Sequence, residues 1–325
     1  MCTSMAFQSH DFYFGRNMDI EYSFGEQVVV VPRNYPIPFQ VESYLHQHYA
    51  MVGMAHVEDG VPLFAEAVNE KGLCMAGLNF PGNAWYPKER AADKYNITPY
   101  EIIPWLLGRC ASVEEAREKL EHMHFVAIPF RETLPLTPLH WMITDKKESI
   151  VLEPTRDGLH IYENPVGVLT NNPTFDYQLM NLNHYLNLTS GYPKNRFGGD
   201  VELSPFGQGL GGFGLPGDFS PASRFVKTAF LKSNSVCDQD ENSSVAQVFH
   251  ILDGVAMVQG SVITQEGKCD ITTYSCCVNA DQGIYYYKTY GNNQISAVDM
   301  HREDLEGTAL AVFDLIKEQQ IFHMN

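Results

Sequence analysis

The sequence predicts an α+β fold in which helices cover the faces of β-sheets. Strand patterns occupy both ends of the chain, and amphipathic helical patterns lie between them. Of the 325 residues, 44% are hydrophobic and 19% are charged, so the chain can bury a substantial core. We find no internal repeat and no linker, and we therefore expect residues 1–325 to form a single domain.

The first strands form the start of this pattern. Residues 3–8 and 12–17 are expected to pair as a hairpin, because a Ser-His-Asp turn at residues 9–11 separates them. A third strand is expected at residues 27–31. It ends at Pro32, which has no N–H to donate to a strand ladder.

Two helices follow, and each begins with a capping pattern. Thr98 and Glu101 form the first capping box, and Pro104 is expected to bend the helix that follows. Ser112 and Glu115 repeat the pattern at the start of a second helix. The apolar face of this second helix has residues three to four apart: Val113, Ala116, Leu120 and Met123.

The second half of the chain contains further strands, a long irregular segment and two more helices. Strands are expected at residues 141–144, 149–153 and 159–162. Residues 186–219 are rich in Gly and Pro, and we expect a projecting loop there that covers a site or an interface. Helices at 220–231 and 245–258 and strands at 271–278, 283–290, 294–300 and 308–315 complete the pattern.

Charge and hydropathy exclude several classes of protein. The formal net charge is −17, from 22 Lys and Arg against 39 Asp and Glu, and no basic run is present. Phosphate backbones and anionic lipid surfaces would repel such a chain, so we expect no nucleic-acid or membrane partner. The longest conspicuous apolar stretch, residues 28–32, is far too short to span a bilayer.

The N-terminus and the cysteines indicate the compartment. Charged residues interrupt the first thirty positions, where a signal peptide needs a continuous apolar region. The seven cysteines are odd in number and form no CxxC pair, which fits free thiols better than a disulfide framework. We therefore expect a cytoplasmic protein.

Cys2 is the first candidate for chemistry. Removal of Met1 would place a thiol and a free α-amine on one residue at the head of a strand. An N-terminal amine has a reference pKa of about 8, so it can accept the proton of an attacking thiol near neutral pH. Taken alone, an early cysteine is more often an ordinary small apolar residue.

Two charged residues on the second strand strengthen the case for Cys2. The hairpin turn brings Arg16 and Asp19 back beside the first strand, and both are expected to face Cys2. The guanidinium would favour a thiolate, and the carboxylate would orient the α-amine. The alternative for this pair is a surface ion pair.

Six motifs along the chain carry a family resemblance: MCT at residues 1–3, FGRNMD at 14–19, NEKGL at 69–73, AGLNF at 76–80, LTNNP at 169–173 and LPGDFSPASR at 215–224. With these motifs the chain resembles the choloylglycine hydrolases, which include the bile salt hydrolases. They belong to the N-terminal nucleophile amidases, as do the penicillin V acylases. The similarity extends from Met1 to the last strands.

The resemblance implies a fold and a set of catalytic residues. The fold is an αββα sandwich, two stacked antiparallel sheets between helical layers. Cys2 would be the nucleophile, with Arg16 and Asp19 as partners. The side-chain amide of Asn171 and the backbone of Asn79 would stabilise the oxyanion. The last of the implied catalytic residues is Arg224.

The resemblance also implies an apolar substrate pocket formed by Met18, Ala65, Phe130 and Leu134. Such a pocket suits a flat steroid better than a polar acyl group, although core packing is an equally good explanation for any one of these residues. Position 79 is Asn, as in bile salt hydrolases, whereas penicillin V acylases typically have Tyr there.

Other patterns point to no cofactor and no metal. Gly207–Gly212 matches GxGxxG, but no strand-to-helix unit surrounds it. The pairs His46/His48 and His122/His124 have no further ligands at metal-binding spacing.

The sequence thus predicts a cysteine amidase that cleaves glycine- or taurine-conjugated bile acids without a cofactor. Two alternatives remain: a penicillin V acylase, and a non-catalytic binder of steroid-like anions in a chain that retains Met1. The family resemblance implies a homo-oligomer, commonly a homotetramer, with residues 186–219 as the expected interface element.

Overall fold

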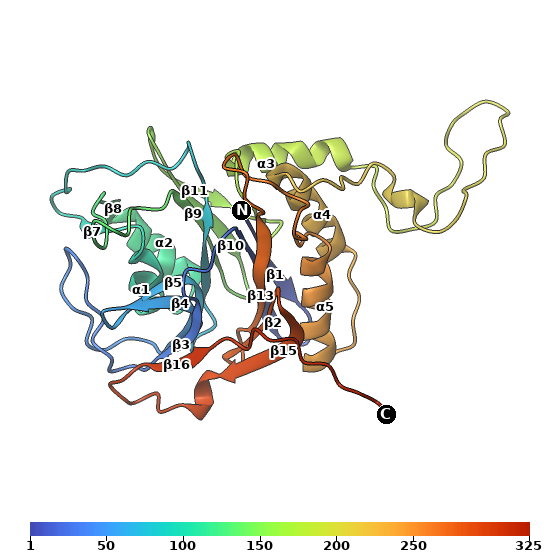
Figure 1. Cartoon of the computed structure of the whole chain (residues 1–325). Coiled ribbons are helices and arrows are strands. Elements are labelled where there is room, and N and C mark those ends of the chain that lie inside the picture. Colours follow the sequence, from blue (N-terminus) through green and yellow to red (C-terminus); the bar gives the residue numbers. More distant parts are fainter.

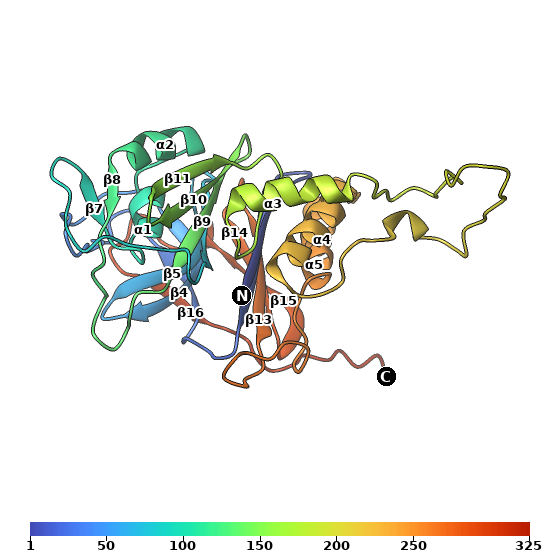
Figure 2. The same cartoon turned by 90° about the horizontal axis from the view of Figure 1, so that it is seen from above.

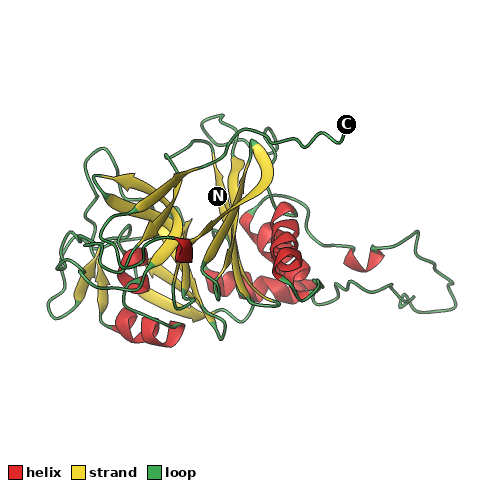
Figure 3. Cartoon of the chain, turned by 90° about the horizontal axis from the view of Figure 1, so that it is seen from below, coloured by secondary structure: helices red, strands yellow, loops and turns green.

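Two antiparallel sheets stack face to face, and helices cover their outer surfaces, as Figure 1 shows for the computed structural model of residues 1–325. The layers run from α1 and α2 through an eight-stranded sheet and a six-stranded sheet to α4 and α5 (Figure 3). The prediction of an αββα sandwich is confirmed.

The six-stranded sheet combines the first two strands of the chain with strands from its second half. Its strand order is β12-β1-β2-β13-β14-β15, and every pair in it is antiparallel. The strands are β1 (Cys2–Gln8), β2 (Phe12–Ile20), β12 (Val168–Leu169), β13 (Ile271–Asn279), β14 (Ile284–Thr289) and β15 (Asn292–Asp299). The predicted N-terminal hairpin is therefore confirmed, and it lies in the middle of the sheet.

The eight-stranded sheet has the order β11-β10-β9-β6-β5-β4-β3-β16. Its strands are β3 (Gln27–Val31), β4 (Met51–Glu58), β5 (Val61–Asn69), β6 (Cys74–Asn79), β9 (Leu139–Thr144), β10 (Ser149–Thr155), β11 (Gly158–Glu163) and β16 (Ala311–Asp314). A separate parallel pair joins β7 (Tyr95–Ile97) to β8 (Met123–Phe125).

Side-chain alternation divides the eight-stranded sheet between two cores. Val28 and Val30 pack into the core between the sheets, whereas Val29 and Val31 pack under α1 and α2. Consecutive residues of a strand point to opposite faces, so a continuous run of valines is what a strand buried on both faces requires.

The helices are α1 (Ile102–Leu107), α2 (Val113–Glu121), α3 (Phe175–Asn181), α4 (Pro221–Ser233) and α5 (Glu241–Asp253), with short 3-10 turns at Leu182–Tyr185, Leu210–Gly212 and Met300–Arg302. The capping box of α2 is confirmed, because Ser112 Oγ accepts from the N–H of Glu115 and Glu115 Oε2 accepts from the N–H of Ala111. At α5 the close approach to β2 depends on Gly15, where a Cβ atom would lie 2.8 Å from Val248.

Some predicted boundaries are wrong. The first helix begins at Ile102 rather than near residue 98, so Pro104 lies in its first turn, where a missing N–H costs no intrahelical bond. Met123 belongs to β8 and not to the face of α2. The last helix starts four residues early, because Asp240 caps it by accepting from the N–H of Ser243, and it ends before Gly254.

The segment from residue 186 to residue 219 extends away from the sandwich as a long loop beyond α3 and α4 (Figure 2). Its regular structure is limited to the 3-10 turn at Leu210–Gly212. Several large apolar side chains in it are exposed, among them Leu186, Phe197, Phe206 and Phe213. Across the whole chain, no helix is long and apolar enough to cross a lipid bilayer.

Candidate active site

Cys2 is the first residue of β1, and its side chain lies between the two sheets. Its register partner on β2 is Met18, so the two side chains share a face, and Arg16 lies on the same face one pair further along. The Cys2 side chain is 3% exposed, and Arg16 Nη2 lies 3.1 Å from its sulfur. The predicted contact between a guanidinium and the thiol is present.

Arg16 is held from the opposite sheet. Its Nη1 donates to the carbonyl oxygen of Ala65 and to Glu66 Oε2, each at 2.7 Å. Burial disfavours the guanidinium charge, but the Cys2 sulfur and the Glu66 carboxylate outweigh it and raise the pKa of Arg16 well above its ordinary value. Arg16 is therefore a permanent cation beside the Cys2 sulfur.

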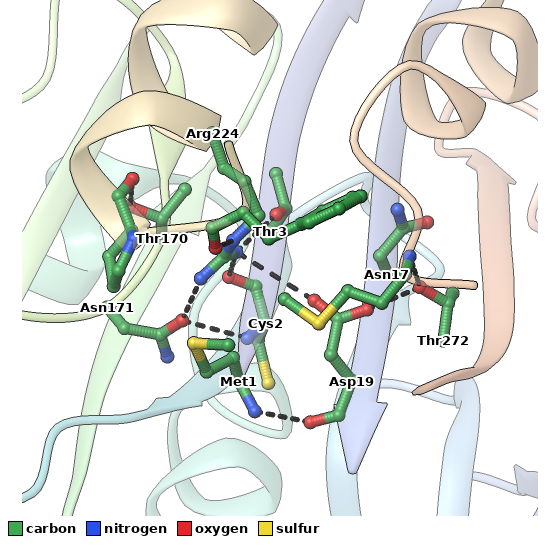
Figure 4. A network of polar contacts seen from close by, with 12 residues as sticks. Met1, Cys2, Thr3, Asn17, Asp19, Thr170, Asn171, Arg224 and Thr272 are labelled. Carbon is green, nitrogen blue, oxygen red and sulfur yellow. Dashed lines mark hydrogen bonds and ion pairs between the residues drawn. The ribbon is translucent and has the colours of Figure 1, made fainter. Parts of the chain in front are cut away.

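Arg224 approaches Cys2 from the helix side of the six-stranded sheet (Figure 4). Its Nη1 donates to the backbone oxygen of Cys2 at 2.5 Å and to Thr3 Oγ1 at 2.7 Å. Its Nε donates to the backbone oxygen of Phe219 at 2.9 Å, which holds the segment just before α4 against the Arg224 side chain. This side chain fixes the backbone around Cys2 rather than the sulfur.

Asn171 joins three parts of the site through one amide. Its Oδ1 accepts from the N–H of Cys2 at 2.9 Å and from Arg224 Nη2 at 2.7 Å. Its Nδ2 donates to the backbone oxygen of Asn79 at 2.7 Å. If the Asn171 amide were flipped, its NH2 group would face the N–H of Cys2 and the guanidinium of Arg224, which are both donors, so these contacts determine the orientation of the amide. One hydrogen of Nδ2 then remains for a further acceptor.

Asp19 was expected to face Cys2 and to orient its α-amine, but its side chain lies on the face of β2 opposite to Arg16, and the Cys2 nitrogen donates to Asn171 Oδ1 instead. Residues 16 and 19 have opposite parity on β2, so their side chains lie on opposite faces. Asp19 Oδ1 accepts from Thr272 Oγ1 at 2.6 Å, and Oδ2 lies 3.8 Å from Arg224 Nη1. Burial raises the pKa of Asp19, although Arg224 and the N-terminal amine oppose this effect.

The four residues predicted to form an apolar pocket lie in two places. Met18 Sδ is 3.8 Å from the Cys2 sulfur, and Ala65 contacts Arg16 through its backbone oxygen. Phe130 and Leu134 instead line a cavity of about 200 Å³, and neither Cys2 nor Met18 is among its lining residues. The structure does not bring these two pairs into one cavity.

Sequence reasoning missed three polar residues beside Arg16. Glu66 on β5 is fully buried, and the hydroxyl groups of Tyr274 and Tyr285 both donate to its carboxylate. The indication available in the sequence was a single charged residue within the otherwise uncharged strand Val61–Asn69. No group of three or more His, Cys, Asp or Glu side chains is arranged as metal ligands would be.

A two-sheet sandwich with a cysteine at the head of its central hairpin is the architecture of the N-terminal nucleophile hydrolases. Within that class, residues 2–313 match the family described as linear amide C–N hydrolases, choloylglycine hydrolase family. The chain belongs to this family, as the sequence motifs predicted.

Named relatives support the same family assignment over the full length of the chain. A bile salt hydrolase/transferase of Lactiplantibacillus plantarum is 50% identical, and one of Clostridium perfringens is 44% identical, each over 100% of both chains. A solved variant of the conjugated bile acid hydrolase of Clostridium perfringens superposes with a TM-score of 0.93 over 100% of both chains.

A more distant structure shares the fold alone. The penicillin V acylase of Agrobacterium tumefaciens has a TM-score of 0.73 and 21% identity, over 96% of this chain and 90% of that one. The αββα sandwich thus extends beyond the proteins named for bile acids.

Proposed function

We propose that this enzyme hydrolyses the amide bond between a bile acid and glycine or taurine. The observation that carries the proposal is a buried Cys2 thiol, 3.1 Å from Arg16, in a chain that matches bile salt hydrolases from end to end. The lower similarity to penicillin V acylases makes phenoxyacetyl amides a less suitable substrate class.

The active form requires removal of Met1. In the uncut chain the Cys2 nitrogen is an amide, whose lone pair is not basic. Cleavage of the Met1–Cys2 bond turns that nitrogen into an amine beside its own thiol. Asn171 Oδ1, 2.9 Å from the nitrogen, remains as its acceptor.

Acylation follows from this pair. The Cys2 sulfur attacks the substrate carbonyl carbon, and the thiol proton passes to the α-amine, directly or through water. The free hydrogen of Asn171 Nδ2 and the backbone N–H of Asn79 donate to the developing oxyanion, each worth about 3 kcal/mol in the transition state. The C–N bond breaks, glycine or taurine leaves with the proton, and a thioester remains.

Deacylation uses the same groups. The α-amine takes a proton from water as the water oxygen attacks the thioester carbonyl. The C–S bond breaks, the proton returns to sulfur, and the free bile acid leaves. Arg16 stabilises negative charge on the sulfur in both steps. Arg224 holds the backbone of Cys2 through the Cys2 oxygen and through Asn171, and Asp19 lies 3.8 Å from Arg224.

The apolar side chains would bind the steroid. Met18 and Ala65 lie nearest the sulfur, and Phe130 and Leu134 line the neighbouring cavity beside Leu63 and Phe64 of β5. We propose that the ring system spans from the first pair to the second, past Phe64, which neighbours Ala65 on β5 and lines the cavity.

The test is release of glycine and taurine from conjugated bile acids, together with the intact mass. The wild type should lack Met1 and release both amines. Cys2→Ala should lose Met1, remain folded and release neither amine, because no nucleophile remains. Cys237→Ser is the matched control, since that thiol contacts Ser9 at a distant turn. Wild-type turnover by Cys2→Ala would contradict the proposal.

We propose further that residues 186–219 form the interface of a homotetramer. Phe206 and Phe213 are almost fully exposed on this projecting loop, and such apolar surface is usually covered by a partner. The double variant Phe206→Ser/Phe213→Ser should give a smaller species in light scattering. Val236→Ser, at an exposed apolar residue outside the loop, should not. An unchanged mass in the double variant would refute the interface.

Free thiols support a reducing compartment as the location. All seven cysteines are unpaired, and four of those other than Cys2 are buried. We propose that the enzyme acts in the cytoplasm, where such thiols persist. Cell fractionation with an antibody to the chain tests this, and recovery from the culture medium alone would refute it.

A further inference from the structure

Glu66 is a fully buried carboxylate whose contacts lead directly to Cys2. It lies on β5 in the eight-stranded sheet, and three side chains of the opposite sheet donate to it. Arg16 Nη1 lies 2.7 Å from Oε2, and Tyr285 OH lies 2.5 Å from Oε1. Tyr274 OH lies 2.9 Å from Oε2 and 3.1 Å from Oε1. Glu66 therefore bridges the two sheets behind the nucleophile.

The two tyrosines fix the carboxylate plane. A carboxylate has about four lone-pair positions, and here donors from β2, β13 and β14 use both oxygens. Burial, reinforced by the Glu66 charge, raises the pKa of Tyr274 and of Tyr285 well above the ordinary value. Both hydroxyl groups therefore stay protonated and remain donors throughout the working pH range.

The fixed carboxylate in turn determines where Arg16 points. The guanidinium is planar, and its Nη1 edge is anchored to the backbone oxygen of Ala65 and to Glu66 Oε2. With that edge anchored, Nη2 is directed at the Cys2 sulfur, while Nε has no partner. Without the carboxylate, one carbonyl contact would remain on the anchored edge, and the plane could rotate about it.

We propose that Glu66 is a positioning residue that holds Arg16 against the Cys2 sulfur, with Tyr274 and Tyr285 holding Glu66. The role rests on the proposed function in one respect, that Cys2 is the nucleophile. Glu66 touches no substrate; it acts through Arg16. A merely structural ion pair would predict lower stability in its absence but no change in the behaviour of the thiol.

The experiment measures two properties of each variant, one of which needs no bile acid. The first is the rate at which iodoacetamide alkylates Cys2 at pH 7, followed by peptide mass. The second is kcat and KM for release of glycine from a conjugated bile acid. Failure of the wild type to release glycine would count against the proposed function, and the alkylation rates would still test Glu66.

Glu66→Gln keeps the size of the side chain and removes the charge. We expect kcat to fall at least about tenfold, with KM within about threefold, because the lost interaction acts on the reacting sulfur. Alkylation of Cys2 should slow by a similar factor. Glu66→Asp retains the charge with a shorter reach, and it should recover part of both rates.

Two further variants separate positioning from folding. Glu101→Gln removes another buried carboxylate, one that accepts from backbone N–H groups near α1, and it should lower stability while leaving both rates unchanged. Tyr285→Phe keeps the ion pair but leaves Glu66 Oε1 with only the longer contact of 3.1 Å from Tyr274, and it should slow both rates about two- to fivefold even if Glu66→Gln does not fold. A folded Glu66→Gln, or Tyr285→Phe, with wild-type kcat and alkylation would overturn the proposal.

Discussion

Cys2 lies between two buried arginines, and the two differ in how their charge is balanced. Arg16 has a carboxylate at 2.7 Å, and its pKa is raised. Arg224 is surrounded mainly by neutral acceptors, with its nearest carboxylate oxygen 3.8 Å away, and burial lowers its pKa. The difference shows that a buried cation can serve either as a charge or as a set of hydrogen-bond donors. Arg16 acts on the sulfur as a charge, and Arg224 acts on the backbone as a donor.

The largest expected effect is that of Arg16→Gln. The substitution removes the cation from the sulfur and leaves Glu66 buried without its partner. We expect kcat to fall about a thousandfold and the free energy of unfolding to fall by about 3–5 kcal/mol. Kinetics and urea denaturation measure the two effects. A loss of stability without a loss of kcat would assign Arg16 to the core alone.

Arg224→Gln should have a smaller effect on activity. It removes donors to Cys2 O, Thr3 Oγ1 and Asn171 Oδ1, so Asn171 loses the contact that fixes its amide. We expect kcat to fall about a hundredfold, the range found when an oxyanion donor is displaced. Arg224→Lys supplies charge without the planar fork and should not restore activity. Full recovery by Lys would contradict the donor role.

Lys232 extends the comparison to a half-buried cation that has no carboxylate partner. It lies on α4 with Arg224, and its Nζ donates to the backbone oxygen of Val166. Burial lowers its pKa from 10.5 to about 8. The unfolded chain therefore binds more protons between those values, and stability should rise as pH increases from about 8 towards 10.5.

The variant Lys232→Met tests the predicted direction of this pH dependence of stability. At pH 7 the variant should be more stable than the wild type by about 1–2 kcal/mol, because the wild type must keep a charge in a poor environment. The advantage should shrink as pH rises, as thermal unfolding between pH 7 and pH 10 would show. An advantage that is constant with pH would mean that packing rather than charge explains it.

Substitution of Asp218 is expected to have the smallest effect on stability. Asp218 lies just before α4, the helix that contains Arg224. It accepts from the N–H of Ser220 and from Ser223 Oγ, and these bonds lower its pKa from 3.8 to about 2. Since the side chain is exposed, Asp218→Asn should cost only about 0.5–1 kcal/mol at pH 7. The difference should disappear as pH falls from 3.8 towards 2.

Local patterns predicted the parts of the fold that depend on neighbours in sequence. The hairpin of β1 and β2 and the cap of α2 were predicted correctly, because turn and capping residues determine them within a few positions. The predicted start of the last helix at residue 245 is wrong, because Asp240 caps α5 and the helix begins at Glu241, before the apolar face that starts at Val245.

In the candidate site, too, contacts between neighbours in sequence could be predicted, whereas contacts between distant strands could not. The position of Cys2 after Met1 and the hairpin turn predicted that Arg16 lies beside Cys2, and strand parity alone would have placed Asp19 on the other face of β2. The partners of Glu66 could not be predicted, because its donors Tyr274 and Tyr285 come from strands more than two hundred residues away on the opposite sheet. No local pattern encodes a pairing across two sheets.

The contacts around the first two residues also determine when, during synthesis, the N-terminus can become buried. The N-terminal amine donates to Asp270, and Arg224 donates to the backbone oxygen of Cys2. These hydrogen bonds can form only after Arg224 and Asp270 have been synthesised and have left the ribosome. At about 5–20 residues per second, the N-terminus stays free of them for roughly ten seconds or more. The proposed removal of Met1 therefore has this interval in which to take place, before the later strands pack against the N-terminus.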